Sequence, residues 1–104
     1  MRKIEEQMNR AIRNRQRWQS GNTSVIIGHE NEVDVYLHGN HIATVSPNAI
    51  RIFDGGWQSV TTKSRLNALL DEFSYGSRVF QRNFEWFLSK RNSKTLDFES
   101  GMTV

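Results

Sequence analysis

Three histidines are the side chains of this sequence best suited to hold a metal ion or to transfer a proton. His38 and His41 flank a Gly-Asn pair, and both residues of that pair tolerate the positive φ of a two-residue hairpin turn. We therefore expect the two imidazoles to be cross-strand neighbours, with Asp34 or His29 as candidates for a third metal ligand. Because no nucleophile motif accompanies them, we interpret the histidines as exposed hairpin residues and assign no catalytic or metal-binding residue.

The predicted start of the second helix offers a site for an anion. Thr61 and Thr62 stand before Lys63 and Arg65, so unpaired first-turn amides, the helix dipole and two cations would meet at one point. The glycine pattern of a phosphate-binding loop is missing. Lys63 and Arg65 are candidate binding residues. The alternative is a capped helix with solvated charges, in which a Thr hydroxyl accepts from a first-turn amide.

The excess of positive charge is confined to the first segment of the chain. Residues 1–18 hold six basic and two acidic side chains, whereas the remaining residues hold eight basic and nine acidic ones. Arg10, Arg13 and Arg17 follow Glu6 at helical spacing and form one stripe of the predicted first helix. These three arginines are candidate binding residues for phosphate or for an acidic protein. A solvated helix face, supported by a pair between Glu6 and Arg10, is the alternative interpretation.

Aromatic side chains suggest a further binding mode. A stacking platform for single-stranded nucleic acid needs exposed rings beside arginines on a sheet. The residues available for it are Tyr36, Trp57, Phe84 and Trp86 with Arg78 and Arg82. A domain of this length has a small core, and each ring left outside forgoes about 2 kcal/mol of a total stability of about 5–15 kcal/mol. We therefore expect most of these rings to lie inside.

The elements that position these residues follow from the spacing of apolar side chains. Helical spacing predicts helices at residues 1–19 and 62–74, and alternation predicts a β meander from 23 to 60. The strands expected in the meander span residues 23–27, 33–37, 42–45, 49–53 and 57–60. Residues 79–88 fit a helix or two strands, and aromatic density favours strands with a turn at Arg82 and Asn83. The tail, residues 89–104, either docks a short extended piece or stays mobile.

Composition bounds the fold class and excludes several kinds of protein. The chain has 104 residues, a net charge of +3, 37% hydrophobic side chains and no cysteine. One α+β domain over residues 1–104 is expected, with both helices on one face of an antiparallel sheet. The lack of cysteine excludes disulfides, thiolate nucleophiles and cysteine zinc sites. No run approaches the ~20 apolar residues of a membrane helix, so we expect a soluble intracellular protein.

Three stretches of the chain carry a resemblance. They read VYLHGNHIA at residues 35–43, GGWQSVTTKSRLNALL at 55–70 and VFQ at 79–81. Over residues 20–90 the sequence resembles short, largely uncharacterised accessory proteins of tailed bacteriophages, including T7-like phages. The resemblance implies a small phage protein expressed in the bacterial host cytoplasm, and it supplies no active site.

Two hypotheses of function follow from these observations. The leading one is a nonenzymatic phage accessory protein, without cofactor or membrane partner, that binds and modulates a host protein of defence or nucleic-acid metabolism, with inhibition as the expected effect. The alternative is direct DNA or RNA binding by the basic first helix, with Lys63 and Arg65 assisting. A hydrolase or nuclease that uses His38 and His41 is a weaker third class. The sequence leaves the oligomeric state open, a dimer included.

Overall fold

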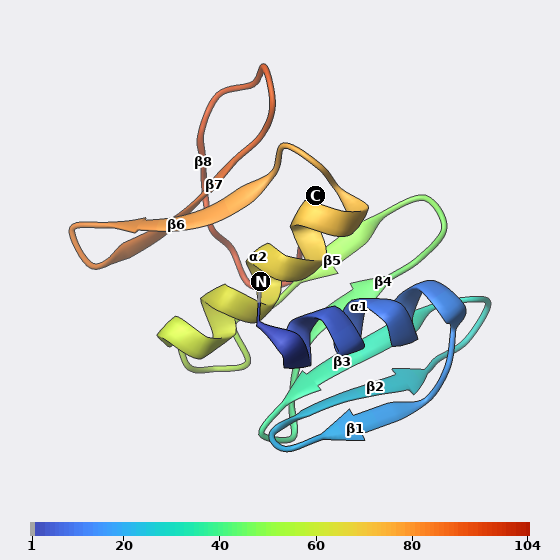
Figure 1. Ribbon diagram of the computed structural model, residues 1–104. Helices are drawn as coiled ribbons and strands as arrows, with labels where there is room; N and C mark the ends of the chain where they lie inside the picture. Colours follow the sequence, from blue (N-terminus) through green and yellow to red (C-terminus); the bar gives the residue numbers. More distant parts are fainter. Residues whose placement is uncertain (1) are drawn as a thin grey trace.

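The structure is a computed structural model that describes residues 2–104 and arranges them as an α+β fold (Figure 1). The helices are α1 (Lys3–Asn14) and α2 (Val60–Phe73). The strands are β1 (Trp18–Ser20), β2 (Thr23–Ile27), β3 (Val33–Leu37), β4 (Asn40–Val45), β5 (Ile50–Ile52), β6 (Arg78–Arg82), β7 (Glu85–Ser89), β8 (Leu96–Asp97) and β9 (Met102–Thr103). The predicted fold class is confirmed.

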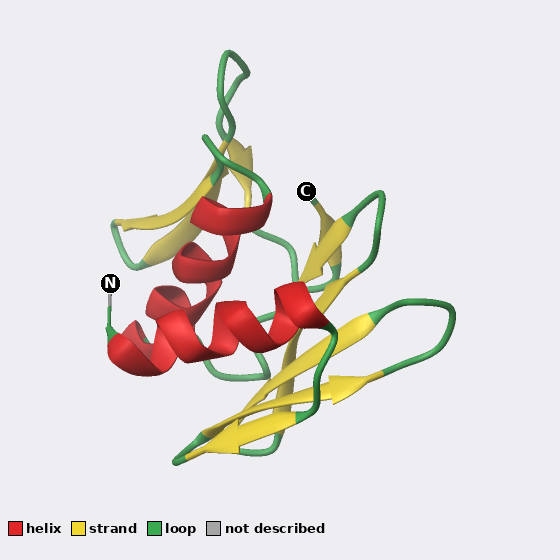
Figure 2. Cartoon of the chain, turned by 45° about the vertical axis from the view of Figure 1, so that its right-hand side comes forward, coloured by secondary structure: helices red, strands yellow, loops and turns green. Residues whose placement is uncertain are grey.

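Six strands form the larger sheet, in the order β1-β2-β3-β4-β5-β9 with antiparallel pairing throughout. Both helices lie on one face of this sheet, as the red and yellow ribbons of Figure 2 show. The smaller sheet, β6-β7-β8, lies beyond α2. Part of the predicted tail therefore docks twice, because β8 pairs with β7 and β9 pairs with β5.

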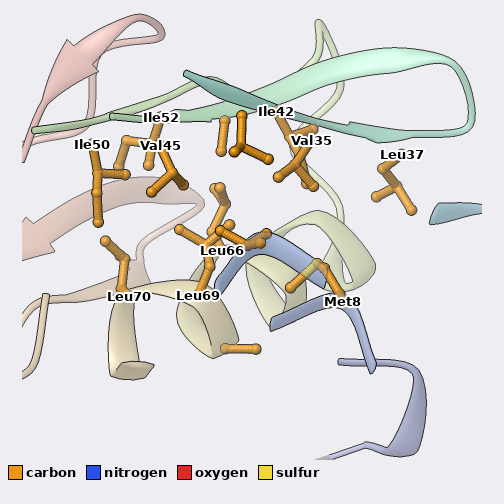
Figure 3. Packing of buried hydrophobic residues seen from close by; sticks show 14 of the residues in the cluster. Met8, Val35, Leu37, Ile42, Val45, Ile50, Ile52, Leu66, Leu69 and Leu70 are labelled. Carbon is orange, nitrogen blue, oxygen red and sulfur yellow. The ribbon is translucent and has the colours of Figure 1, made fainter. Parts of the chain in front are cut away.

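The core lies between the helices and the sheet because apolar residues alternate along the strands and recur at helical spacing along α1 and α2. In β3, Val33, Val35 and Leu37 are buried while the residues between them are half-buried. Met8 of α1 and Leu69 of α2 have no exposed surface and face the strands (Figure 3). Burial of each such side chain contributes about 1.5–3 kcal/mol.

Helix α1 ends five residues before the predicted boundary at residue 19. Arg15 adopts the left-handed conformation with φ 52°, and its backbone N–H bonds the carbonyls of Ala11 and Ile12. This arrangement closes the helix without a glycine. Trp18 then begins β1, opposite Val25, although its spacing matched the apolar face of a longer helix.

The predicted strand at residues 57–60 is wrong. Val60 begins α2, and Ser59 is its N-cap, with the Ser59 hydroxyl accepting a hydrogen bond from the Thr62 amide at 3.1 Å. The prediction of a threonine cap placed the helix start too late. Val60 and Trp57 are 70% and 75% exposed. These apolar side chains therefore do not mark the buried face of a strand.

The turn between β3 and β4 differs from the prediction by one residue. His38 and Gly39 occupy it, both with positive φ, and Leu37 pairs with Asn40 rather than with Ile42. A register shift follows between Val35 and Tyr36, as in a β-bulge. His41 therefore faces Tyr36, and the two histidines are not cross-strand partners.

The aromatic segment at 79–88 forms strands, as predicted, but its turn is at Asn83 and Phe84 instead of Arg82 and Asn83. Both turn residues have positive φ, 52° and 66°, which is the pattern of a type I′ turn. Asn tolerates this conformation. Phe at the second position carries steric strain, because glycine is the residue that the position favours.

Phe84→Gly is expected to raise the free energy of unfolding by about 0.5–1 kcal/mol. The Phe84 ring is 92% exposed, so its removal sacrifices little packing, while glycine relieves the strain of a positive φ. Thermal denaturation followed by circular dichroism measures the change. A lower melting temperature than that of the wild type would show that the ring contributes packing that outweighs the strain.

Candidate binding surface beside helix α2

Arg65, a predicted binding residue, lies in the interior. It is 4% exposed, and its guanidinium donates to the Glu5 carboxylate at 2.8 Å and to the Thr23 hydroxyl at 3.0 Å. The Ser64 hydroxyl donates to the same carboxylate at 2.5 Å. Arg65 therefore joins α2 to α1 and to β2, and its side chain is not presented to an external phosphate.

Lys63 remains at the surface, on the side of α2 that faces the smaller sheet. It is half-buried, and its ammonium donates to the Gln81 side-chain oxygen of β6 at 3.2 Å. The helix start thus presents one of its two predicted cations, because residues 63 and 65 point to different sides of α2.

The predicted arginine stripe of the first helix is divided. Arg10 is exposed on α1, whereas Arg13 forms an ion pair with Glu72 of α2. Arg17 is exposed but lies beyond the end of the helix, since α1 stops at Asn14. The three predicted binding residues therefore do not share one helical face.

His41 belongs to a polar chain on the sheet face opposite the helices. Its Nε2 lies 2.8 Å from the Thr44 hydroxyl, which donates to an Asp34 carboxylate oxygen at 2.7 Å. The direct distance from His41 Nε2 to Asp34 is 3.6 Å. Asp34 thus approaches His41 as the sequence suggested, but His38 stands apart in the turn. Across residues 2–104, the structure gathers no group of three or more potential metal ligands.

The aromatic residues of the predicted stacking platform do not assemble. Trp86 is 5% exposed and packs edge-on against Phe98, with ring centroids 5.2 Å apart. The Tyr36 ring lies beside that of His41 on the outer face of the larger sheet, with centroids 5.3 Å apart and the planes tilted by 36°. The expectation that most of the rings lie inside holds for Trp86 and fails for Trp57 and Phe84, which are exposed on separate loops.

Trp57 is held at the surface by the turn that precedes α2. An Asp54 carboxylate oxygen accepts from the Gly56 amide at 2.8 Å, and the Asp54 carbonyl accepts from the Trp57 amide at 3.2 Å. Gly55 and Gly56 both have positive φ. A Cβ on Gly55 would stand 3.1 Å from Asn40, so this glycine also lets the turn lie close to β4.

Beside the Trp57 indole is a pocket of about 320 Å³, and we call the indole and this pocket the Trp57 surface. The pocket has an apolar floor of Leu37 and Ile42 and a polar rim to which His38, Asp54 and Ser59 contribute. An apolar pocket with a polar rim, beside an exposed indole, suits the side chain of another macromolecule. The sequence signal for it is Asp-Gly-Gly-Trp at residues 54–57, a glycine turn followed directly by an indole.

Comparison with protein families gives a match that covers the whole chain. The Kyanoviridae Gp96 protein family matches residues 1–104. The chain belongs to this family. Searches of curated proteins and of solved structures find no match.

Membership of the Kyanoviridae Gp96 protein family makes this a phage protein, of a cyanophage family. The expected phage origin is confirmed, but the likeness to T7-like phages in particular is not part of the finding. No helix in the described part of this Gp96 family member is long and apolar enough to cross a membrane.

Proposed function

We propose that this phage protein is a nonenzymatic accessory protein that binds and inhibits a host protein of defence or nucleic-acid metabolism in the host cytoplasm. The observation that supports this function is the Trp57 surface. Its indole is 75% exposed at the edge of a pocket with a buried apolar floor. Tryptophan is among the residues most enriched in the energetic centres of protein interfaces.

The Trp57 surface has the construction of an interface anchor. The indole offers a large apolar area at a low cost in side-chain entropy, because two torsion angles define it. The Asp54 hydrogen bonds and the close approach of Gly55 to Asn40 hold the turn in place before binding. Preorganisation of this kind reduces the ordering entropy lost on association. A partner with one protruding apolar side chain and one apolar hollow would fit both parts.

Direct nucleic-acid binding by α1 has weaker support. Such a surface needs several cations that reach neighbouring phosphates. Arg13 is already paired with Glu72, and Arg17 lies outside the helix, which leaves Arg10 as the remaining predicted cation on α1. No residue of α1 lines the Trp57 pocket, so binding by that helix would leave the Trp57 surface unused.

Trp57→Ala is expected to weaken capture of the host partner by at least about 30-fold, the effect of truncating an interface hot spot. The immobilised protein is exposed to a nuclease-treated cyanobacterial lysate, the retained protein is identified, and its affinity for wild type and variant is then measured by titration. Phe84→Gly is the matched control, because it removes another exposed ring, 92% exposed against 75% for Trp57, from a different loop. Equal affinity of wild type and Trp57→Ala, or no stoichiometric partner in the lysate, would contradict the proposed function.

A further inference from the structure

A wide groove of about 940 Å³ lies between α2 and the smaller sheet, on the other side of the α2 N-terminus from the Trp57 surface. Residues from four stretches of the chain, 2–5, 60–71, 75–78 and 89–91, line it, and we call it the basic groove. Its cations are Arg2 before α1, Lys63 on α2, Arg78 on β6 and Arg91 after β7. The first, third and fourth of these side chains are exposed, and Lys63 is half-buried.

The charge of the groove is unbalanced. Two acidic residues line it, Glu5 and Asp71. Glu5 is neutralised from behind by the buried Arg65, at 2.8 Å. Asp71 therefore remains as the one acidic side chain without such a neutralising pair to set against the four cations of the lining. A concave surface with this imbalance attracts a polyanion.

Tyr75 adds an aromatic ring to the lining of the groove. Tyr75 is 75% exposed, and the Arg91 guanidinium carbon is 5.9 Å from its ring centroid. Gly76 makes this contact possible, because a Cβ there would stand 2.7 Å from the Arg91 Cβ. A planar ring beside a guanidinium is the arrangement on which an unpaired base stacks.

The two walls of the groove are fixed to each other. The Asn67 side-chain amide donates to the Val79 carbonyl at 2.9 Å and accepts from the Val79 amide at 2.8 Å, so a helix residue pairs with β6 as another strand would. Lys63 bonds Gln81 of the same strand. Arg78, the neighbour of Val79, is thus held at a defined distance from α2.

We propose that the basic groove binds single-stranded nucleic acid, with phosphates on its four cations and an unpaired base on Tyr75. Beyond Arg78, the next cation of β6 has an acidic neighbour. At the far end of β6, Arg82 lies opposite Glu85 of β7, so this cation outside the groove has an acidic cross-strand partner. We therefore place the single-stranded nucleic acid in the groove. This ligand is separate from the host protein assigned to the Trp57 surface, and either site can fail without the other.

The test is fluorescence anisotropy of the full chain with a fluorescein-labelled 15-nucleotide oligo(dT). Four phosphate contacts on a single strand predict that affinity falls about sevenfold for each doubling of salt concentration. Tyr75→Ala should weaken binding about tenfold and leave the salt dependence unchanged, whereas Tyr75→Phe should keep the wild-type affinity. Arg78→Ala with Arg91→Ala should weaken binding and lower the salt dependence by half.

The matched control is Arg10→Ala with Arg17→Ala, which removes the same charge from exposed positions outside the groove and should change affinity less than twofold. No binding by the wild type at 50 mM salt would overturn the proposal. So would equal binding to a duplex of the same length, or loss of binding in the Arg10 and Arg17 variant alone. Competition by polyglutamate that is as strong as competition by unlabelled oligo(dT) would instead identify an acidic protein segment as the ligand.

Discussion

Arg65→Met is expected to lower the free energy of unfolding by about 3–5 kcal/mol, the cost of leaving one partner of a buried ion pair without the other. The substitution keeps an unbranched, apolar stem in the space but leaves the Glu5 carboxylate, 4% exposed, without its cation. It also removes the guanidinium donors to Thr23 and Asn22. Chemical denaturation at neutral pH measures the loss.

The double variant Glu5→Leu with Arg65→Met separates the charge effect from packing. Because it removes both buried charges, it should recover most of the lost stability. Lys63→Ala, a change at a neighbouring cation that is not in the interior, should alter stability by less than about 0.5 kcal/mol. If Arg65→Met cost no more than Lys63→Ala, the pair would not hold α1 against α2.

Leu69→Ala is expected to lower the free energy of unfolding by about 2–5 kcal/mol, the range for truncating a buried leucine. Leu69 has no exposed surface and lies on α2 where the helix faces the larger sheet (Figure 3). Its neighbours along the helix, Leu66 and Leu70, are also fully buried, so the cavity would open at the centre of the core. Urea denaturation gives the value directly.

Leu96→Ala provides the control for this substitution. The Leu96 side chain is 42% exposed in the two-residue strand β8, so the same chemical change should cost less than about 1 kcal/mol. Equal losses from the two variants would mean that the cluster around α2 does not dominate the stability of the fold.

Sequence analysis located an element well where the spacing of its apolar residues matched the residues that are buried in the structure. The alternation at 33–37 corresponds to β3, and the leucine spacing of the second helix corresponds to the buried face of α2. The predicted boundaries were wrong where the helical spacing of apolar residues continued past the end of the helix. Trp18 fitted the apolar stripe of a longer helix, but the left-handed Arg15 ends α1 before it and Trp18 begins β1.

The candidate site was less predictable because its residues are defined by distant partners. Nothing in the neighbouring residues marks Arg65 as buried, because its burial depends on Glu5, sixty residues earlier. The Arg13 side chain is likewise fixed by an ion pair with Glu72, a residue of the other helix. The Asn67 pairing with Val79 has no sequence pattern at all. In each case the local spacing was correct, but the partner that fixes the side chain comes from another element.

Strand β9 covers β5 and forms one edge of the larger sheet. β9 pairs with β5 over two residues, Ile52 with Met102 and Arg51 with Thr103, and further bonds join Gly101 and Val104 to the same strand. A strand pairing of two residues is among the parts of a sheet that open at the lowest free-energy cost. When it opens, β5 presents bare amides and carbonyls between two isoleucines, the kind of edge on which other chains assemble. Residues 101–104 thus cover an edge strand that would otherwise be open to self-association.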